Sequence, residues 1–277
     1  MWTVETGVFL NYVHAVNKCL ISESCFSSFK RDAGYNSIVG MAREWQAEIW
    51  FNNIKENFPA IFKRLDDFKH NDSVGEPELW DSKEAGLISP STLRYLHTLC
   101  DIQKHFGLLD NKRVVEIGIG YGGLCYMLHT YYQLENYHLV DLENVVTFAR
   151  KYLNSLNMNK SISFECPYKP VEIPDEFRIE TKTSNNCEEV MAVKGDSSYD
   201  LAISEFCLSE MDDEGIDDYC EKFLFTSENI YLLMNLHDEK RKNRCINKIQ
   251  EVFDVELLPE FPESEWPNYV VVGKKKK

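Results

Sequence analysis

The sequence predicts an α/β fold, in which a Rossmann-like sheet ends in an antiparallel hairpin and follows a helical N-terminal extension. Three observations predict it. Up to about Leu109, apolar residues recur at three- and four-residue steps, as in amphipathic helices. From Lys112 onward, short apolar runs alternate with helical stretches, which specifies parallel strands covered by helices. The last two strand-like runs, VFDVELL and NYVVVGK, are joined by PEFPESEWP, which leaves no room for a helix and implies a hairpin.

Residues 1–87 are expected to form the helical extension, as a lid or a dimerisation layer, and residues 88–277 the Rossmann-like domain. The extension holds two helical patterns, followed by the turn-rich stretch NDSVGEPELWDS. The first pattern places apolar residues at Phe9, Tyr12, Val13, Val16 and Leu20, and the second is MAREWQAEIWFNNIKENFPAIFKRLDDF. Ser89 and Pro90 supply an N-cap and a first-turn proline, so the helix over STLRYLHTLCDIQKHF is expected to begin there.

The second region alternates strands with helices in a regular order. The expected strands are RVVEIGI, YHLVDL, SISFEC, YDLAIS and NIYLLMNL, and the expected helices are GGLCYMLHTYYQL, ENVVTFARKYLNSL and GIDDYCEKFLF. The third strand stays open, because EVMAV fits as well as SISFEC and both precede YDLAIS.

A glycine-rich loop follows the strand RVVEI and contains Gly118, Gly120, Gly122 and Gly123. Glycines are needed there because the chain turns sharply from strand to helix and its backbone must approach a ligand closely. The loop also satisfies the GxGxxG pattern of dinucleotide sites, so a nicotinamide or flavin cofactor has to be considered. Tyr121 lies within the loop and is expected either to cover the cofactor or to pack in the core.

Two carboxylates beside the loop favour a different cofactor, S-adenosyl-L-methionine. Glu116 stands two residues before the first glycine, where a carboxylate suits the cationic amino-acid end of this cofactor and repels a pyrophosphate. Asp141, with Leu142 next to it, ends the following strand, where a carboxylate accepts hydrogen bonds from ribose hydroxyls. The adenine is expected near the end of the third strand, which is Phe164, Glu165 and Cys166 if SISFEC is that strand. The predicted cofactor contacts are Glu116, Gly118, Gly120, Tyr121, Gly122, Asp141, Leu142, Ser204 and Glu205.

From about Ile88 to Lys274 the chain resembles the sugar O-methyltransferase family, a class I methyltransferase group found with glycan biosynthesis. The resemblance lies in VVEIGIGYGGLCYML, YHLVDLENVVTFARKYL, YDLAISEFCLSEMDDEGIDDYCEKFL and NIYLLMN. It implies transfer of a methyl group from S-adenosyl-L-methionine to a hydroxyl of a sugar or glycan. The sequence departs from the family pattern after the fifth strand, where Asn235, Leu236 and His237 stand in place of an early basic residue.

Methylation of a hydroxyl requires a base, because a hydroxyl is a poor nucleophile at neutral pH. Ligands of open parallel sheets bind beyond the carboxyl ends of the strands, so the candidates follow the fourth and fifth strands. His237 is the preferred base because the pKa of imidazole lies near the working pH. Glu205 and Glu210 are the other candidates, although Ser and Glu residues there could equally cap a helix.

Composition narrows the remaining choices. The formal charge of −15 disfavours nucleic acid and anionic membranes as partners, and no run of residues is long and apolar enough to span a membrane. The nine cysteines form no CxxC pair, so we expect reduced thiols, no bound metal and a cytoplasmic location. Two other functions stay open: an NAD(P)-dependent oxidoreductase that uses the same loop, and a non-catalytic partner with a methyltransferase fold.

Overall fold

A seven-stranded sheet forms the centre of the molecule, in the computed structural model that describes residues 6–39, 42–158, 161–167, 198–236, 238–263 and 267–277. Its strands lie in the order β5-β4-β3-β6-β7-β9-β8. Their bounds are β3 Arg113–Ile117, β4 Asn136–Val140, β5 Ile162–Glu165, β6 Tyr199–Glu205, β7 Ser227–Asn235, β8 Phe253–Pro259 and β9 Asn268–Lys275. The first five strands in this order pair in parallel, and β9 pairs antiparallel with both β7 and β8. The predicted Rossmann-like sheet with a terminal hairpin is confirmed, with β9 inserted between β7 and β8.

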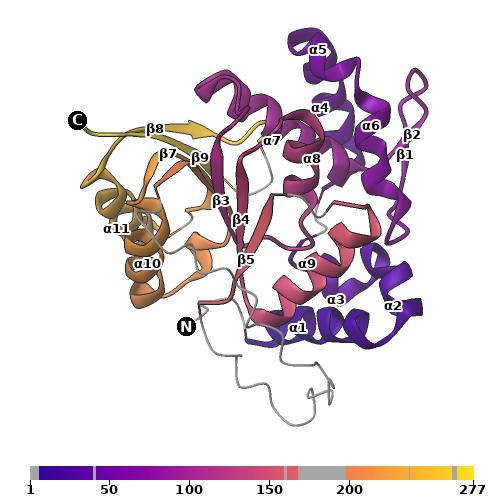
Figure 1. Ribbon diagram of the computed structural model, residues 1–277, viewed down its shortest axis with the longest axis horizontal. Coiled ribbons are helices and arrows are strands. Elements are labelled where there is room, and N and C mark those ends of the chain that lie inside the picture. The colour runs from indigo at the N-terminus through magenta and orange to yellow at the C-terminus, as the bar shows by residue number, and fades with distance from the viewer. Residues whose placement is uncertain (1–5, 40–41, 159–160, 168–197, 237, 264–266) are drawn as a thin grey trace.

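One helix precedes the first strand of the sheet, and the other helices of this region connect strands that follow one another in the chain (Figure 1). They are α7 Pro90–Phe106, α8 Gly123–Tyr131, α9 Glu143–Ser155, α10 Asp213–Tyr219 and α11 Glu239–Gln250. Helix α7 begins where the sequence predicts, because Ser89 is its N-cap and accepts a hydrogen bond at Oγ from the backbone N–H of Thr92. Helix α11 was not expected. Its segment EKRKNRCINKIQ is mostly polar and buries Cys245 and Ile249, so its apolar pattern is faint.

Alternate residues of each central strand face opposite sides of the sheet. In β7, Tyr231 and Leu233 belong to the hydrophobic core shared with α7, α8, α9 and the N-terminal helices. Ile230, Leu232 and Met234 belong to a second core, which α10 and α11 cover. The sheet therefore separates a thick helical layer from a thinner one (Figure 1).

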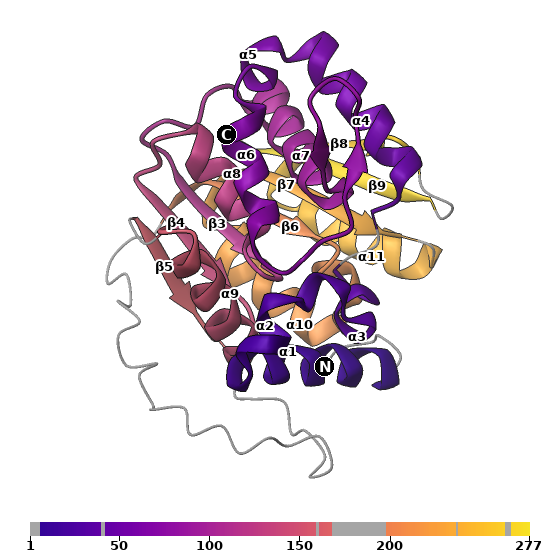
Figure 2. The same cartoon turned by 90° about the vertical axis from the view of Figure 1, so that its right-hand side faces the viewer.

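The N-terminal helices all lie on the thick side. They are α1 Thr6–Ile21, α2 Glu23–Ser27, α3 Ala33–Asn36, α4 Glu44–Asn57, α5 Pro59–Phe62 and α6 Leu65–Lys69, with short 3-10 turns at Phe29–Arg31 and His70–Ser73. Helix α1 packs along α9 and α4 packs along α7, so α1 to α3 and α4 to α6 lie at opposite ends of this layer (Figure 2). The turn-rich stretch before α7 holds a two-stranded hairpin of β1 Trp80–Asp81 and β2 Leu87–Ile88. The division of the chain at residues 87 and 88 stays a prediction.

None of the helices in the described segments is both long and apolar enough to cross a membrane.

Candidate functional site

A cavity of about 580 Å³ opens at the carboxyl ends of β3, β4 and β6. One side of it, which we call the floor, consists of Glu116, residues 118–120, Asp141, Leu142 and residues 205–207. The opposite side, which we call the roof, consists of Tyr12, Val39, Gln46, Trp50, Arg94 and Tyr95. The floor thus comes from strand ends and the loops that follow them, and the roof comes from α1, the segment after α3, α4 and α7.

The glycine loop shapes the floor through its backbone. Gly118 and Gly120 have φ values of 78° and 53°, in the left-handed region that glycine adopts without strain. A Cβ atom on Gly118 would lie 2.2 Å from Cβ of Cys207, so β3 and β6 come too close at this point for any side chain. Gly122 is the N-cap of α8 and contacts Leu153 behind the floor, so the predicted contact of Gly122 with the cofactor is not found in this cavity.

Asp141 ties the glycine loop to the end of β4. Its Oδ2 accepts a hydrogen bond of 2.9 Å from the backbone N–H of Ile119, and its Oδ1 accepts one of 2.7 Å from the N–H of Leu142. Burial raises the pKa of Asp141 to about 6, although hydrogen bonds from the backbone of Leu142, Ile119 and Gly120 oppose the rise. The carboxylate faces the cavity, where lone pairs that the backbone does not use can accept further hydrogen bonds.

Glu116 is a buried carboxylate on the same floor, with only 4% of its surface exposed. The Tyr137 hydroxyl donates a hydrogen bond of 2.7 Å to its Oε2. Burial raises the pKa of Glu116 well above its usual range, the hydrogen bond from Tyr137 lowers it, and the charges of Glu205 and Asp141 raise it further. The floor therefore groups buried carboxyl groups whose ionised forms a cationic ligand would stabilise.

Glu205 and Glu210 both border the cavity, as the sequence predicts for catalytic candidates. Glu205 ends β6, and its Oε1 accepts a hydrogen bond of 2.7 Å from the hydroxyl of Thr98 on α7. Burial raises the pKa of Glu205, while the neighbouring Arg94 lowers it. Glu210 stands on the 3-10 turn Leu208–Glu210 that follows β6. Ser204 is buried in β6 and does not line the cavity, so it is not placed to contact a ligand there.

Tyr121 does not cover the cavity. Its ring is buried against Tyr152, at 4.8 Å between centroids, and against Phe29, at 5.4 Å. Its hydroxyl accepts a hydrogen bond of 3.3 Å from the Asn71 side chain. Of its two expected roles, the structure therefore shows packing, which holds the loop from behind.

His237, the preferred base, lies outside the described residues. Its neighbour Asn235 lines the cavity at the end of β7, and the backbone N–H of Asn235 donates to Oγ of Ser209 at 3.2 Å. The end of β7 therefore reaches the site, but the role of His237 stays a prediction.

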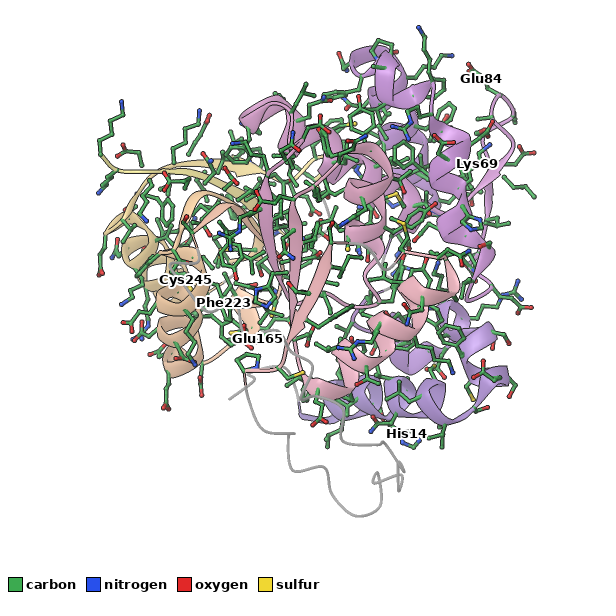
Figure 3. The ribbon with its side chains drawn as sticks, viewed as in Figure 1. His14, Lys69, Glu84, Glu165, Phe223 and Cys245 are labelled. Atoms are coloured by element: carbon green, nitrogen blue, oxygen red, sulfur yellow. The ribbon has the colours of Figure 1, made fainter. Side chains whose placement is uncertain are left out.

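The third parallel strand is SISFEC, since β5 pairs with β4, whereas EVMAV falls outside the described part of the chain. Glu165 lies at the carboxyl end of β5 (Figure 3), and its Oε2 is 3.2 Å from Nε2 of His138. The guanidinium of Arg150 lies over the ring of Phe164, with its Cζ 4.7 Å from the ring centroid. Neither of these residues, nor Cys166, lines the cavity, so the expected adenine contact at the end of β5 is not found there.

The sequence analysis expected a lid or a dimerisation layer from residues 1–87 but did not identify Arg94 and Tyr95 of α7, which belong to the roof. Three polar residues lie one turn apart on one face of α7, namely Arg94, Thr98 and Asp101. Because most of α7 is buried, such a row of polar residues could have indicated from the sequence that this face borders a site. Phe206 was missed as well. It lines the cavity with a φ of 65°, which is rare for a residue other than glycine and is typical of functional sites.

No three histidine, cysteine or acidic side chains converge on a possible metal position within the described residues. Two acids of the DDEGIDD run, Asp213 and Asp217, instead form ion pairs with Arg244 of α11.

No protein-family model matches the chain, and no curated protein matches it. Among solved structures, the chain is similar to an rRNA methylase from Streptococcus thermophilus, with 16% identity over 66% of this chain and 98% of that one and a TM-score of 0.44. It is similar to a methyltransferase from Pyrococcus furiosus, with 13% identity over 65% and 82% of the two chains and a TM-score of 0.45. A third similar structure is TrmK of M. capricolum in complex with S-adenosyl-homocysteine, with 12% identity over 65% and 68% of the two chains and a TM-score of 0.41.

Proposed function

We propose that this protein is an S-adenosyl-L-methionine-dependent methyltransferase and that its acceptor is a hydroxyl of a sugar or glycan. One observation carries the proposal: two buried carboxylates, Glu116 and Asp141, face one cavity beside an open glycine backbone. Bound at such a floor, S-adenosyl-L-methionine supplies an electrophilic methyl group. Asp141 would accept hydrogen bonds from the ribose hydroxyls, and Glu116 would bind the ammonium group.

The same geometry argues against a dinucleotide cofactor. A pyrophosphate in a Rossmann fold binds at the N-terminus of the helix after the glycine loop. Here that end of α8 is covered, because a Cβ atom on Gly123 would lie 2.4 Å from the ring of Tyr95 and 2.8 Å from that of Tyr121. Glu116 would in addition place a buried negative charge near the phosphates.

The acceptor assignment rests on the family resemblance and on the chemistry of the cavity wall. Beyond the floor the cavity is bordered by Trp45, Trp50, Glu260 and Asn268, which offer aromatic faces and hydrogen-bond acceptors to a polyol. The net charge of −15 supports a neutral acceptor rather than a polyanion. A sugar hydroxyl seated there would lose its proton to Glu205 or Glu210, which border the cavity, or to His237, which the sequence proposes.

Calorimetric titration with S-adenosylhomocysteine and with NADH tests the cofactor. We expect S-adenosylhomocysteine to bind, and Gly120→Arg and Asp141→Ala to weaken it by about tenfold or more. Gly120→Arg would fill the space beside Val39, since a Cβ atom on Gly120 already lies 3.3 Å from that side chain. Gly86→Arg is the matched control, because Gly86 also has a positive φ but faces open space.

Binding of NADH without S-adenosylhomocysteine would contradict the proposal and favour the oxidoreductase. Methyl transfer from labelled cofactor to a panel of glycans then tests the acceptor. Cofactor binding with no transfer to sugar, protein or small-molecule acceptors would instead indicate a non-catalytic partner.

A further inference from the structure

Arg94 is a cation set into the roof of an acidic cavity. Five described carboxylates border this cavity, namely Glu116, Asp141, Glu205, Glu210 and Glu260. Two arginines also border it, and they differ in position: Arg43 is exposed before α4, whereas Arg94 extends from the buried face of α7. Arg94 is therefore the cation that a ligand deep in the cavity would meet.

The guanidinium of Arg94 is held in place but incompletely bonded. Its Cζ lies 5.0 Å from the centre of the Tyr95 ring, and its Nη2 donates a hydrogen bond of 3.3 Å to the carbonyl oxygen of Val39. Its Nε is buried and has no hydrogen-bond partner among the residues that the structure describes. A buried donor without a partner is costly, so this atom is suited to a ligand that brings an acceptor.

The neighbouring carboxylate of Glu205 does not fulfil that need. Glu205 interacts with Arg94 through its charge, but its Oε1 is engaged by the Thr98 hydroxyl and no hydrogen bond joins it to Arg94. Arg94 and Glu205 thus lie side by side with opposite charges directed at the same space, and Glu116 adds a second carboxylate to it. This arrangement matches a ligand that carries both signs of charge.

We propose that Arg94 binds the α-carboxylate of the methyl donor, so that Arg94 and Glu116 together recognise its zwitterionic amino-acid end. This inference rests on the proposed function, because it assumes that the donor occupies the floor. A planar guanidinium suits a carboxylate because its parallel N–H groups form paired hydrogen bonds. Through Val39 the same guanidinium holds the segment that lies over Gly120, so a bound carboxylate would also fix this part of the roof.

Calorimetry with two ligands tests this role without any turnover. The ligands are S-adenosylhomocysteine and its decarboxylated analogue, which keeps the adenosine, the thioether and the amine. We expect the unaltered protein to bind S-adenosylhomocysteine about thirtyfold more tightly than the decarboxylated analogue. A factor of this size corresponds to the free energy of hydrogen bonds to a charged group. In Arg94→Met this preference should fall to about twofold or less, because S-adenosylhomocysteine loses its partner while the analogue binds as before.

Arg43→Met is the matched control, since it removes the other arginine of the cavity and should leave the preference unchanged. Arg94→Gln, a polar replacement, carries the same comparison if Arg94→Met does not fold. If both ligands weaken equally in the Arg94 variants, Arg94 acts only on the shape of the roof and the inference is wrong. If the unaltered protein binds S-adenosylhomocysteine with no preference over the analogue, the inference fails while the proposed function stands. If it binds neither ligand, the proposed function itself fails.

Discussion

The floor and the roof of the cavity meet the same space but are built differently. The floor depends on backbone geometry: positive φ angles at Gly118 and Gly120, and the hydrogen bonds that Asp141 accepts from the loop. The roof depends on side chains, which come from four segments between Tyr12 and Tyr95. Substitution of the few floor residues that set the backbone geometry should therefore disrupt the floor as a whole. Substitution of one roof side chain should remove only the contacts of that side chain.

The two regions are joined by direct contacts. Val39 of the roof lies over Gly120 of the floor. Next to the roof on α7, the hydroxyl of Thr98 donates a hydrogen bond to Glu205 of the floor. Substitutions on each side should therefore separate what is essential to the fold from what serves the ligand.

The largest effect is expected from Gly118→Ala, which tests the floor. The new Cβ would lie 2.2 Å from Cβ of Cys207 at a φ of 78°, so the strand ends must move apart. We expect a loss of about 2 kcal/mol or more in the free energy of unfolding, measured in urea, together with loss of S-adenosylhomocysteine binding. Gly86→Ala has a similar φ with no atom near its Cβ and should cost about 1 kcal/mol. Equal losses in the two variants would show that backbone strain alone, and not the contact with Cys207, excludes a side chain.

A smaller effect is expected from Glu116→Gln, which should increase the thermal stability of the protein and decrease its affinity for S-adenosylhomocysteine. Burial raises the pKa of Glu116 in the folded state, so the folded protein binds this proton more tightly than the unfolded chain does. Stability from this group is therefore present at low pH and is lost as the pH rises through the folded pKa. Glutamine keeps the acceptor for the Tyr137 hydroxyl without the charge.

We accordingly expect Glu116→Gln to have a Tm about 2 °C or more above that of the unaltered protein at pH 8, with a smaller gain at pH 5. Its affinity for S-adenosylhomocysteine should fall by about tenfold, because the ammonium group loses a charged partner. Thermal melts across this pH range and calorimetry measure both. A variant that is less stable at pH 8 would show that the Glu116 carboxylate stabilises the fold instead of straining it.

The smallest effect on S-adenosylhomocysteine affinity is expected from Trp50→Phe, which tests the far end of the roof. The indole N–H of Trp50 donates a hydrogen bond of 3.0 Å to the carbonyl oxygen of Phe261, which phenylalanine cannot replace. We expect a loss of about 1 kcal/mol in stability and a change of no more than about twofold in S-adenosylhomocysteine affinity. A tenfold loss of affinity would place Trp50 at the donor and weaken the division between floor and roof.

The sequence by itself determined the sheet and most of the floor. The alternation of apolar runs with helical stretches predicts the strands from β3 to β9 except β5, because a buried parallel strand and an amphipathic helix have different periods. For β5 the sequence left SISFEC and EVMAV as equal alternatives. Glu116, Gly118, Gly120 and Asp141 could be identified because they lie within 26 residues in a pattern that one βαβ unit brings together. Glu205 and Glu210 followed from their place after the next strand, since parallel strands end at one edge.

Only the tertiary structure decided the roof and the role of the aromatic residue in the loop. Tyr121 could have faced either way from a glycine turn, and the packing of Phe29 and Tyr152 from distant helices turned it into the core. In the sequence, Arg94 is only one charged residue of a predicted helix. In the structure, its Nη2 donates to the carbonyl oxygen of Val39, and its Nε is buried without a hydrogen-bond partner among the described residues. The periodicity of the sequence shows which face of a helix is buried, but it does not show which distant segment packs against that face. Each helix would bury its apolar face equally well against another neighbour.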